Sequence, residues 1–126
     1  MTGYFANIKK LTIENSFFRK VLFTTPRMQL VLMSVKPGED LGMEVHNEND
    51  QFFRFEAGEG KVVIDSQEFN VKDGDTVIVP MGSKHDVINT GDVDLKLYTI
   101  YAPAHHPDGT IHKTKEEAMD AEKHED

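Results

Sequence analysis

Apolar and polar residues alternate over short segments along most of the chain, which is the pattern of β-strands. The apolar runs are rich in Val, Ile, Phe, Tyr and Thr, and turn signals such as Pro37-Gly38 and Asp73-Gly74 separate them. Because no long helical stretches alternate with these runs, the pattern favours an all-β sandwich or barrel in one domain. The predicted strands cover residues 17–23, 28–35, 42–46, 51–57, 60–65, 67–72, 75–79, 85–89 and 95–101.

Only the end of the chain is predicted to be helical. Thr114 is a suitable N-cap, and Glu117 stands three residues later, which is the spacing of a capping box. The apolar content of this segment is limited to Ala118, Met119 and Ala121, so we expect a short helix or a frayed tail that docks weakly. The expected division is a β-barrel domain with its N-terminal strands over 1–113 and an acidic helix or tail over 114–126.

Composition narrows the possible functions. The chain has 126 residues, a net charge of −8 and no cysteine. An acidic chain is a poor binder of nucleic acid or of anionic membranes, so neither is expected as a partner. Without cysteine there are no disulfides, thiolate metal sites or cysteine nucleophiles, and a cytoplasmic location is expected. The charge is uneven, because residues 1–38 are net basic while residues 39–113 are strongly acidic.

Four polar positions stand out in the predicted strands. Glu44 and His46 share one face of a strand, because alternate residues point the same way. A hairpin places Gln51 opposite them, followed on the same face by apolar residues, and His85 begins another strand. Burying a carboxylate and two imidazoles together is unfavourable unless they are paired or coordinated. A divalent cation resolves that cost.

The spacing of these residues resembles the cupin superfamily. The first half reads Gly38, Glu44, His46, Gln51 and Gly58, and the second reads Gly74, Pro80, Gly82, His85 and Asn89. Cupins carry G-x5-H-x-H-x3,4-E-x6-G and then G-x5-P-x-G-x2-H-x3-N. The resemblance covers residues 28–103, and within the superfamily it is greatest to small single-domain proteins labelled mannose-6-phosphate-isomerase-like. It implies an all-β jelly-roll barrel, also called a double-stranded β-helix, and a homodimer.

The family's metal ligands fall on Glu44, His46, Gln51 and His85, but only the two histidines match in residue type. Glu44 stands in place of a histidine, and Gln51 stands in place of the glutamate. A shifted register would use His46 and Glu48, but it leaves too few residues before Gln51. The resulting set of two nitrogens and two oxygens suits Fe, Mn, Ni, Cu or Zn, and the sequence does not name the metal. A barrel that has kept the fold without a metal is the alternative.

The sequence does not assign a role to two further sets of residues near the motifs. The segment 104–113 contains His105, His106 and His112, which are predicted to lie in an exposed loop that follows the last strand and that could cover a barrel mouth. The bases nearest the motifs in sequence are Arg54 and Lys84, which do not mark a phosphate site. The sequence therefore favours a metal-dependent enzyme, an isomerase or a dioxygenase, that acts on a small polar molecule. A non-catalytic module that binds or senses a small molecule is the second hypothesis, and a purely structural dimer is the third.

Overall fold

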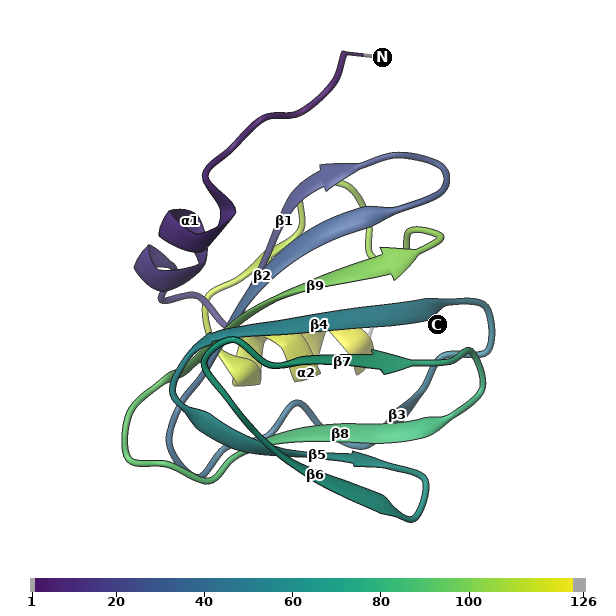
Figure 1. The fold of residues 1–126 in the computed structure, drawn as a ribbon. Coiled ribbons are helices and arrows are strands. Elements are labelled where there is room, and N and C mark those ends of the chain that lie inside the picture. The colour runs from purple at the N-terminus through teal and green to yellow at the C-terminus, as the bar shows by residue number, and fades with distance from the viewer. Residues whose placement is uncertain (1, 124–126) are drawn as a thin grey trace.

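The computed structural model describes residues 2–123, which form two antiparallel β-sheets facing each other and a short helix near each end (Figure 1). Each predicted strand overlaps one of β1 to β9, with ends that differ by at most two residues. The elements are α1 (Ile8–Glu14), β1 (Arg19–Thr24), β2 (Gln29–Val35), β3 (Glu44–Val45), β4 (Asp50–Ala57), β5 (Glu59–Ile64), β6 (Gln67–Lys72), β7 (Thr76–Val79), β8 (Lys84–Asn89), β9 (Leu95–Ala102), β10 (Ile111–His112) and α2 (Lys115–Lys123).

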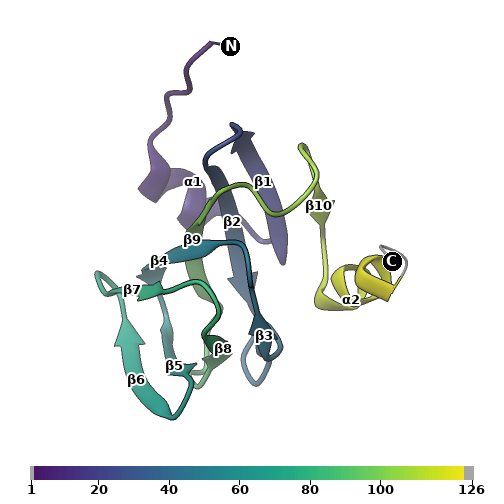
Figure 2. The same cartoon turned by 90° about the vertical axis from the view of Figure 1, so that its right-hand side faces the viewer.

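The strand order is that of a jelly roll. One sheet has the order β10-β1-β2-β9-β4-β7, and the other has the order β3-β8-β5-β6. Consecutive strands often lie in different sheets, so β3 and β4 face each other across the barrel rather than pairing, as do β7 and β8 (Figure 2). The predicted fold class is confirmed. This arrangement brings the chain near residues 44–51 and the start of β8 to the same end of the barrel.

The core lies between the two sheets and follows the period-two pattern of the strands. In β4, Phe53 and Phe55 are fully buried, whereas Phe52 and Arg54 on the opposite face are only partly covered. The other sheet contributes side chains such as Val87, which is also fully buried. Burial of each large apolar side chain stabilises the fold by about 1.5–3 kcal/mol. The sandwich therefore holds its inward-facing positions rigidly, including the polar ones described below.

Helix α1 was not predicted, and this part of the sequence reading was wrong. Asn7 caps the helix, because its side-chain oxygen accepts a hydrogen bond from the backbone N–H of Lys10 at 3.1 Å. Thr12 is fully buried, and its hydroxyl donates to the carbonyl of Ile8 at 2.7 Å. The helix packs against β2, β4 and β9. Its seven residues are too few to be stable alone, so this packing, which is not visible in the local pattern, sustains it.

The predicted capping box is present at the start of helix α2. The expectation that this helix docks only weakly on the barrel was wrong. The N–H of Glu117 donates to the hydroxyl of Thr114 at 3.1 Å, and the N–H of Thr114 donates back to the carboxylate of Glu117 at 3.3 Å. Ala118 is fully buried, and Lys115 forms an ion pair with Asp40. The helix is therefore fixed to the barrel, and the last residues of the predicted tail, 124–126, lie outside the described chain. No helix within residues 2–123 has the length and apolar character needed to cross a bilayer.

Candidate metal centre

Glu44 and His85 lie directly opposite each other on the paired strands β3 and β8. Opposed residues on antiparallel strands present their side chains to the same face, so both side chains belong to one face of the smaller sheet. His85 is buried and Glu44 is partly buried. The sequence predicted that these two residues would converge, and the strand register brings them together.

His46 lies just beyond the end of β3 and is buried at 7% exposure. Its Nε2 is 2.9 Å from Oε2 of Glu44, but the two groups are not aligned for a hydrogen bond. The backbone carbonyl of His46 accepts a hydrogen bond from the N–H of Gly82 at 2.8 Å, which ties this loop to the turn that precedes His85. Gly82 has a φ of +87°, a conformation that favours glycine. The second motif thus helps to position a residue of the first.

One ring nitrogen of His85 forms a hydrogen bond with the backbone, and the other is free to bind a ligand. Its Nδ1 lies 3.1 Å from the carbonyl of Ser83, and a carbonyl can only accept, so Nδ1 carries the proton. Burial lowers the pKa of His85 below its ordinary value, so the ring is neutral near pH 7 and Nε2 keeps a free lone pair. Metal-binding histidines in proteins commonly show this same pattern, with the second nitrogen donating to a backbone carbonyl.

Gln51 projects into the barrel from β4, opposite Tyr101 of β9. Its side-chain amide donates to the hydroxyl of Thr99 at 3.0 Å, which fixes the orientation of the amide group. The remaining atom, Oε1, is buried and accepts no hydrogen bond. Buried polar atoms of this kind are rare in native proteins and call for a partner such as an ion or a water molecule.

A small cavity of about 10 Å³ lies between three of the predicted ligands, Glu44, Gln51 and His85, and His46 is not part of its lining. Its volume corresponds to about one water molecule or one ion. Apolar residues such as Met33, Leu41 and Phe53 form part of its wall, and its polar lining consists of Arg19, Glu44, Gln51, His85 and Tyr101.

The charge of Glu44 is retained in this setting. Burial alone would raise the pKa of Glu44, but the adjacent His46 and the positive charge of Arg19 outweigh it, and the pKa falls below its ordinary value. The cavity therefore contains an ionised carboxylate near pH 7. Among the described residues, three buried side-chain atoms make no hydrogen bond, and all three belong to this region: Nε of Arg19, Nε2 of His46 and Oε1 of Gln51.

The predicted ligands are close, but they are not in coordinating positions. Within residues 2–123, no three His, Cys, Asp or Glu side chains come near enough to hold an ion between them. The ring centres of His46 and His85 are 5.2 Å apart, and the fourth predicted ligand is a glutamine amide. Glu48, which the alternative register would use, has an exposed side chain. In chemistry the donor atoms suit a divalent cation, because they combine imidazole nitrogens with carboxylate and amide oxygens.

Arg19 is a residue of the candidate site that the sequence did not indicate. The bases closest to the motifs in sequence were Arg54 and Lys84, but Arg54 lies on the outer face of β4, where it pairs with Glu56 at 3.0 Å. Arg19 is 2% exposed and lines the cavity from β1, far from either motif in sequence. No local pattern marks it, because its place follows from the pairing of β1 with β2 and β10.

The histidine-rich segment after β9 lies over the end of the barrel beside His46. The ring centre of His105 is 4.4 Å from that of His46, and His105 also stacks on Tyr101 at 5.1 Å. Gln29 anchors the segment, because its side-chain oxygen accepts from the N–H groups of His105 and His106 at 3.1 and 2.9 Å. Burial lowers the pKa of His106 to about 2, so this imidazole is neutral. His105 is exposed, as the sequence predicted, whereas His106 is partly buried and His112 is buried.

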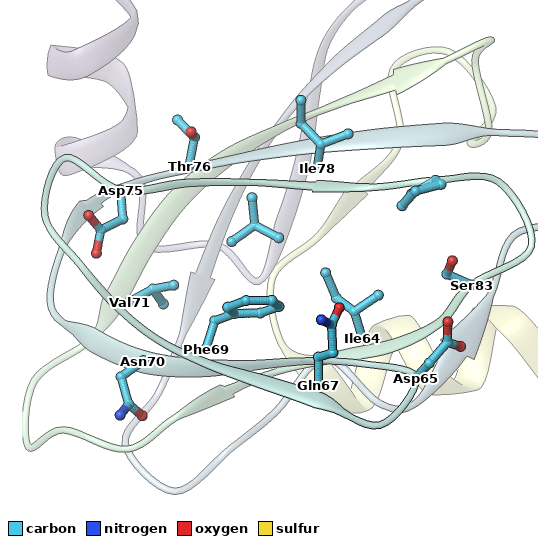
Figure 3. A pocket seen from close by; sticks show the side chains of 12 residues that line it. Ile64, Asp65, Gln67, Phe69, Asn70, Val71, Asp75, Thr76, Ile78 and Ser83 are labelled. Carbon is cyan, nitrogen blue, oxygen red and sulfur yellow. The ribbon is translucent and has the colours of Figure 1, made fainter.

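A much larger hollow of about 710 Å³ lies elsewhere, between the strand edges of β6 and β7 (Figure 3). Its lining includes Ile64, Phe69 and Val71, with Asp65 and Asp75 at its ends. None of the predicted metal ligands lines it. The small cavity is the candidate site, because the charged Arg19 and Glu44 and the amide of Gln51, whose Oε1 accepts no hydrogen bond, all line it.

Comparison with known proteins gives the family. The sequence model of the cupin domain family matches residues 31–101. The chain is 46% identical to the uncharacterized protein YrkC of Bacillus subtilis over 94% of this chain and 67% of that protein. It is 42% identical to the uncharacterized protein L612 of Acanthamoeba polyphaga mimivirus, over 86% of this chain and 70% of that one. The crystal structure of BH2720 from Bacillus halodurans superposes with a TM-score of 0.93 at 42% identity, covering 94% and 95% of the two chains.

Proposed function

The chain belongs to the cupin domain family, and we propose that it holds a divalent metal ion in the barrel and acts on a small polar molecule there. The proposed ligands are Glu44, His46, Gln51 and His85. The observation that carries the proposal is the buried Oε1 of Gln51, which accepts no hydrogen bond, in the same region as Nε2 of His46, which lies 2.9 Å from the ionised carboxylate of Glu44 without an aligned hydrogen bond. A cation satisfies all three atoms at once.

The surroundings of each ligand support this assignment. Thr99 orients the amide of Gln51 so that its carbonyl oxygen is the atom left for a ligand. Ser83 fixes the tautomer of His85 so that Nε2 is the nitrogen left for a ligand. The ring centres of His46 and His85, 5.2 Å apart, are compatible with two imidazoles on one ion. Full coordination still requires side-chain movement, because no three His, Cys, Asp or Glu side chains within residues 2–123 now surround a common point. The cavity wall of apolar residues keeps bulk water away from the charged groups.

The bound ion would supply Lewis-acid chemistry, in which a carbonyl or enediol oxygen of the ligand is polarised. Around it, the chain supplies a negative charge on Glu44, a positive charge on Arg19 and a buried Tyr101 hydroxyl. Burial raises the pKa of the Tyr101 hydroxyl, so this group remains protonated and serves as a hydrogen-bonding group. Isomerisation of a sugar derivative and dioxygenation of an enol-type substrate are the reaction types that this set of groups suits.

Metal analysis with matched variants tests the proposal. The purified protein is dialysed against Mn²⁺ or Zn²⁺, and the bound metal per chain is measured by mass spectrometry. We expect one ion per chain, and we expect His46→Ala and His85→Ala each to weaken binding by about tenfold or more. Glu48→Ala, which alters the exposed carboxylate of the alternative register, should leave binding unchanged. Sub-stoichiometric metal that neither histidine substitution alters would contradict the metal site.

A turnover panel separates the reaction types once metal is bound. Oxygen consumption is measured with enols and diketones, and isomerisation is followed by NMR with small sugars. Oxygen uptake that His46→Ala abolishes identifies a dioxygenase, and isomer formation with the same dependence identifies an isomerase. If the loaded protein turns over none of these compounds, the binding function described next is favoured.

A metal-free or metal-containing binding module is the second candidate. Two observations favour it: the cavity has a volume of only about 10 Å³, and the positive charge of Arg19 already lies near Glu44. In a metal-free module, the guanidinium would provide part of the charge balance that an ion provides in the first proposal. Metal analysis distinguishes the two forms of this module, and saturable ligand binding without turnover distinguishes either of them from an enzyme.

A further inference from the structure

Arg19 is a buried cation that is incompletely paired. Its side chain is 2% exposed, and a guanidinium stays charged at any pH at which proteins fold. Its Nη1 lies 3.1 Å from Nδ1 of His112 and 3.9 Å from the carboxylate of Glu122. The side chain of Glu122 is 39% exposed, so water screens that contact. The Nε–H group is buried and has no hydrogen-bond acceptor.

Buried arginines in proteins are usually matched by acceptors for their N–H groups, most often a carboxylate that takes two of them. Within residues 2–123, Arg19 forms its one ion pair with Glu122 at 3.9 Å and its Nε–H has no acceptor, although Arg19 lines the same cavity as Glu44, Gln51 and Tyr101. The Nε–H donor and the neighbouring charge together point to a ligand with an anionic oxygen. A neutral ligand could accept the Nε–H hydrogen bond, but only an anion would also balance the charge of the guanidinium.

We infer that Arg19 makes the barrel a site for a small carboxylate, with a carboxylate oxygen accepting from Arg19 while the ligand occupies the proposed metal centre. The inference rests on the proposed function, because a divalent ion added to Arg19 and Glu44 leaves the site with net positive charge. An anion restores the balance.

The size and composition of the cavity favour a carboxylate over a phosphate. Among the described residues, no lysine lines the cavity, and Arg19 is its one cation. A phosphate group carries more charge and more acceptor oxygens than one guanidinium satisfies. A volume of about 10 Å³ admits a single atom, so a carboxylate oxygen joins the ion there only with the same side-chain movement that coordination requires. The remainder must extend out of the cavity, and His105 marks the direction, because its exposed ring stacks on Tyr101 and lies beside His46.

Formate is the probe for this inference, and formamide is its neutral counterpart of nearly equal size. Each is titrated into Zn²⁺-loaded protein, and binding is followed by NMR through the imidazole signals. We expect formate to bind the wild type at least about tenfold more tightly than formamide, because only formate is an anion. We expect Arg19→Gln to remove most of this preference and Arg19→Lys to retain part of it. Arg27→Gln, which changes an exposed arginine in the β1–β2 turn, should bind formate like the wild type.

The outcomes separate this inference from the proposed function. If Zn²⁺ binds stoichiometrically to the wild type and to Arg19→Gln, and both prefer formate equally, the role of Arg19 is wrong and the metal site stands. If Zn²⁺ fails to bind, the metal site is wrong, and the same titration of metal-free protein decides whether Arg19 binds formate alone. Inorganic phosphate that binds more tightly than formate would overturn the carboxylate assignment. If Arg19→Gln does not fold, equal binding of formate and formamide by the wild type still refutes the inference.

Discussion

Glu44 and His85 face each other across the β3–β8 pair, each being the Cα partner of the other in the register. The two cupin motifs are separated in sequence, and this pairing joins the first motif to the second. The pairing also fixes which residues of each motif face inward, because a shift of one residue would turn both side chains to the other face of the sheet. The proposed metal centre therefore depends on the strand register as well as on the ligands.

The register predicts the effect of Glu44→His. This substitution places an imidazole where most cupins have one, so we expect the protein to keep its Zn²⁺ affinity or to bind Zn²⁺ more tightly. Binding is measured by competition with a chelating dye. Glu48→His serves as the control, since residue 48 is exposed and should not alter affinity. If Glu48→His tightens binding and Glu44→His has no effect, the alternative register is correct.

Gln51→Glu tests the weakest of the four ligands. The substitution replaces a neutral amide oxygen with a carboxylate, so we expect Zn²⁺ affinity to rise by about tenfold or more, equivalent to about 1.4 kcal/mol. Without metal, the added carboxylate near Glu44 should lower the free energy of unfolding, because two buried like charges repel. Gln67→Glu, at an exposed position on β6, is the matched control. Unchanged affinity in Gln51→Glu would remove Gln51 from the ligand set.

The raised pKa of Asp86 predicts that the free energy of unfolding depends on pH. Burial, followed by the hydrogen bond and the charge of Asp40, raises the pKa of Asp86 from its ordinary value of 3.8 to about 7. Between these values the folded chain holds a proton that the unfolded chain has lost. This group's contribution to the free energy of unfolding therefore falls as pH rises through this window, and it levels off above about pH 7.

Asp86→Asn isolates this contribution, because the histidine titrations are common to both proteins and cancel in the difference. Urea unfolding is measured from about pH 5 to 8. We expect the wild type to lose stability relative to Asp86→Asn as the pH rises to about 7, with a constant difference above that. Parallel stability curves for the two proteins over the whole range would show that the pKa of Asp86 is not raised.

The capping box of α2 predicts a modest loss of stability in Thr114→Ala. The substitution removes the acceptor for the N–H of Glu117, and N-cap residues of this kind contribute about 1 kcal/mol. Ala118 of this helix is fully buried, so fraying of the helix should lower the stability of the whole domain. The comparison is Thr90→Ala at an exposed turn, which should change the free energy of unfolding by less than about 0.5 kcal/mol. Equal stability in the two variants would mean that α2 does not contribute to global folding.

The sequence was sufficient for strands β1 to β9 and for bringing the four predicted ligands to one end of the barrel. Phe53 and Phe55 alternate with Phe52 and Arg54, so the inner face of β4 was readable from period two alone. The motif spacing located Glu44, His46, Gln51 and His85 near one end of the barrel, although their role as ligands stays a prediction.

The features that the sequence did not predict all depend on contacts between distant parts of the chain. Helix α1 is stabilised by the sheet beneath it, and β10 has only two residues, which is too short for a pattern. Arg19 enters the site because β1 pairs with both β2 and β10, and it contacts His112, which lies 93 residues away in sequence. The loop with His105 reaches His46 because Gln29 holds it in place. No local pattern contains this information.

Anomalous diffraction from crystals of the Zn²⁺-loaded protein tests the metal centre most directly, because the zinc edge locates the ion without assuming its ligands. The account predicts one peak per chain within bonding distance of Nε2 of His46 and of His85, with oxygens of Glu44 and Gln51 completing the set at about 2.0–2.2 Å. A peak held elsewhere, for example by His105 and His112 without the motif residues, or no peak in fully loaded crystals, would contradict it.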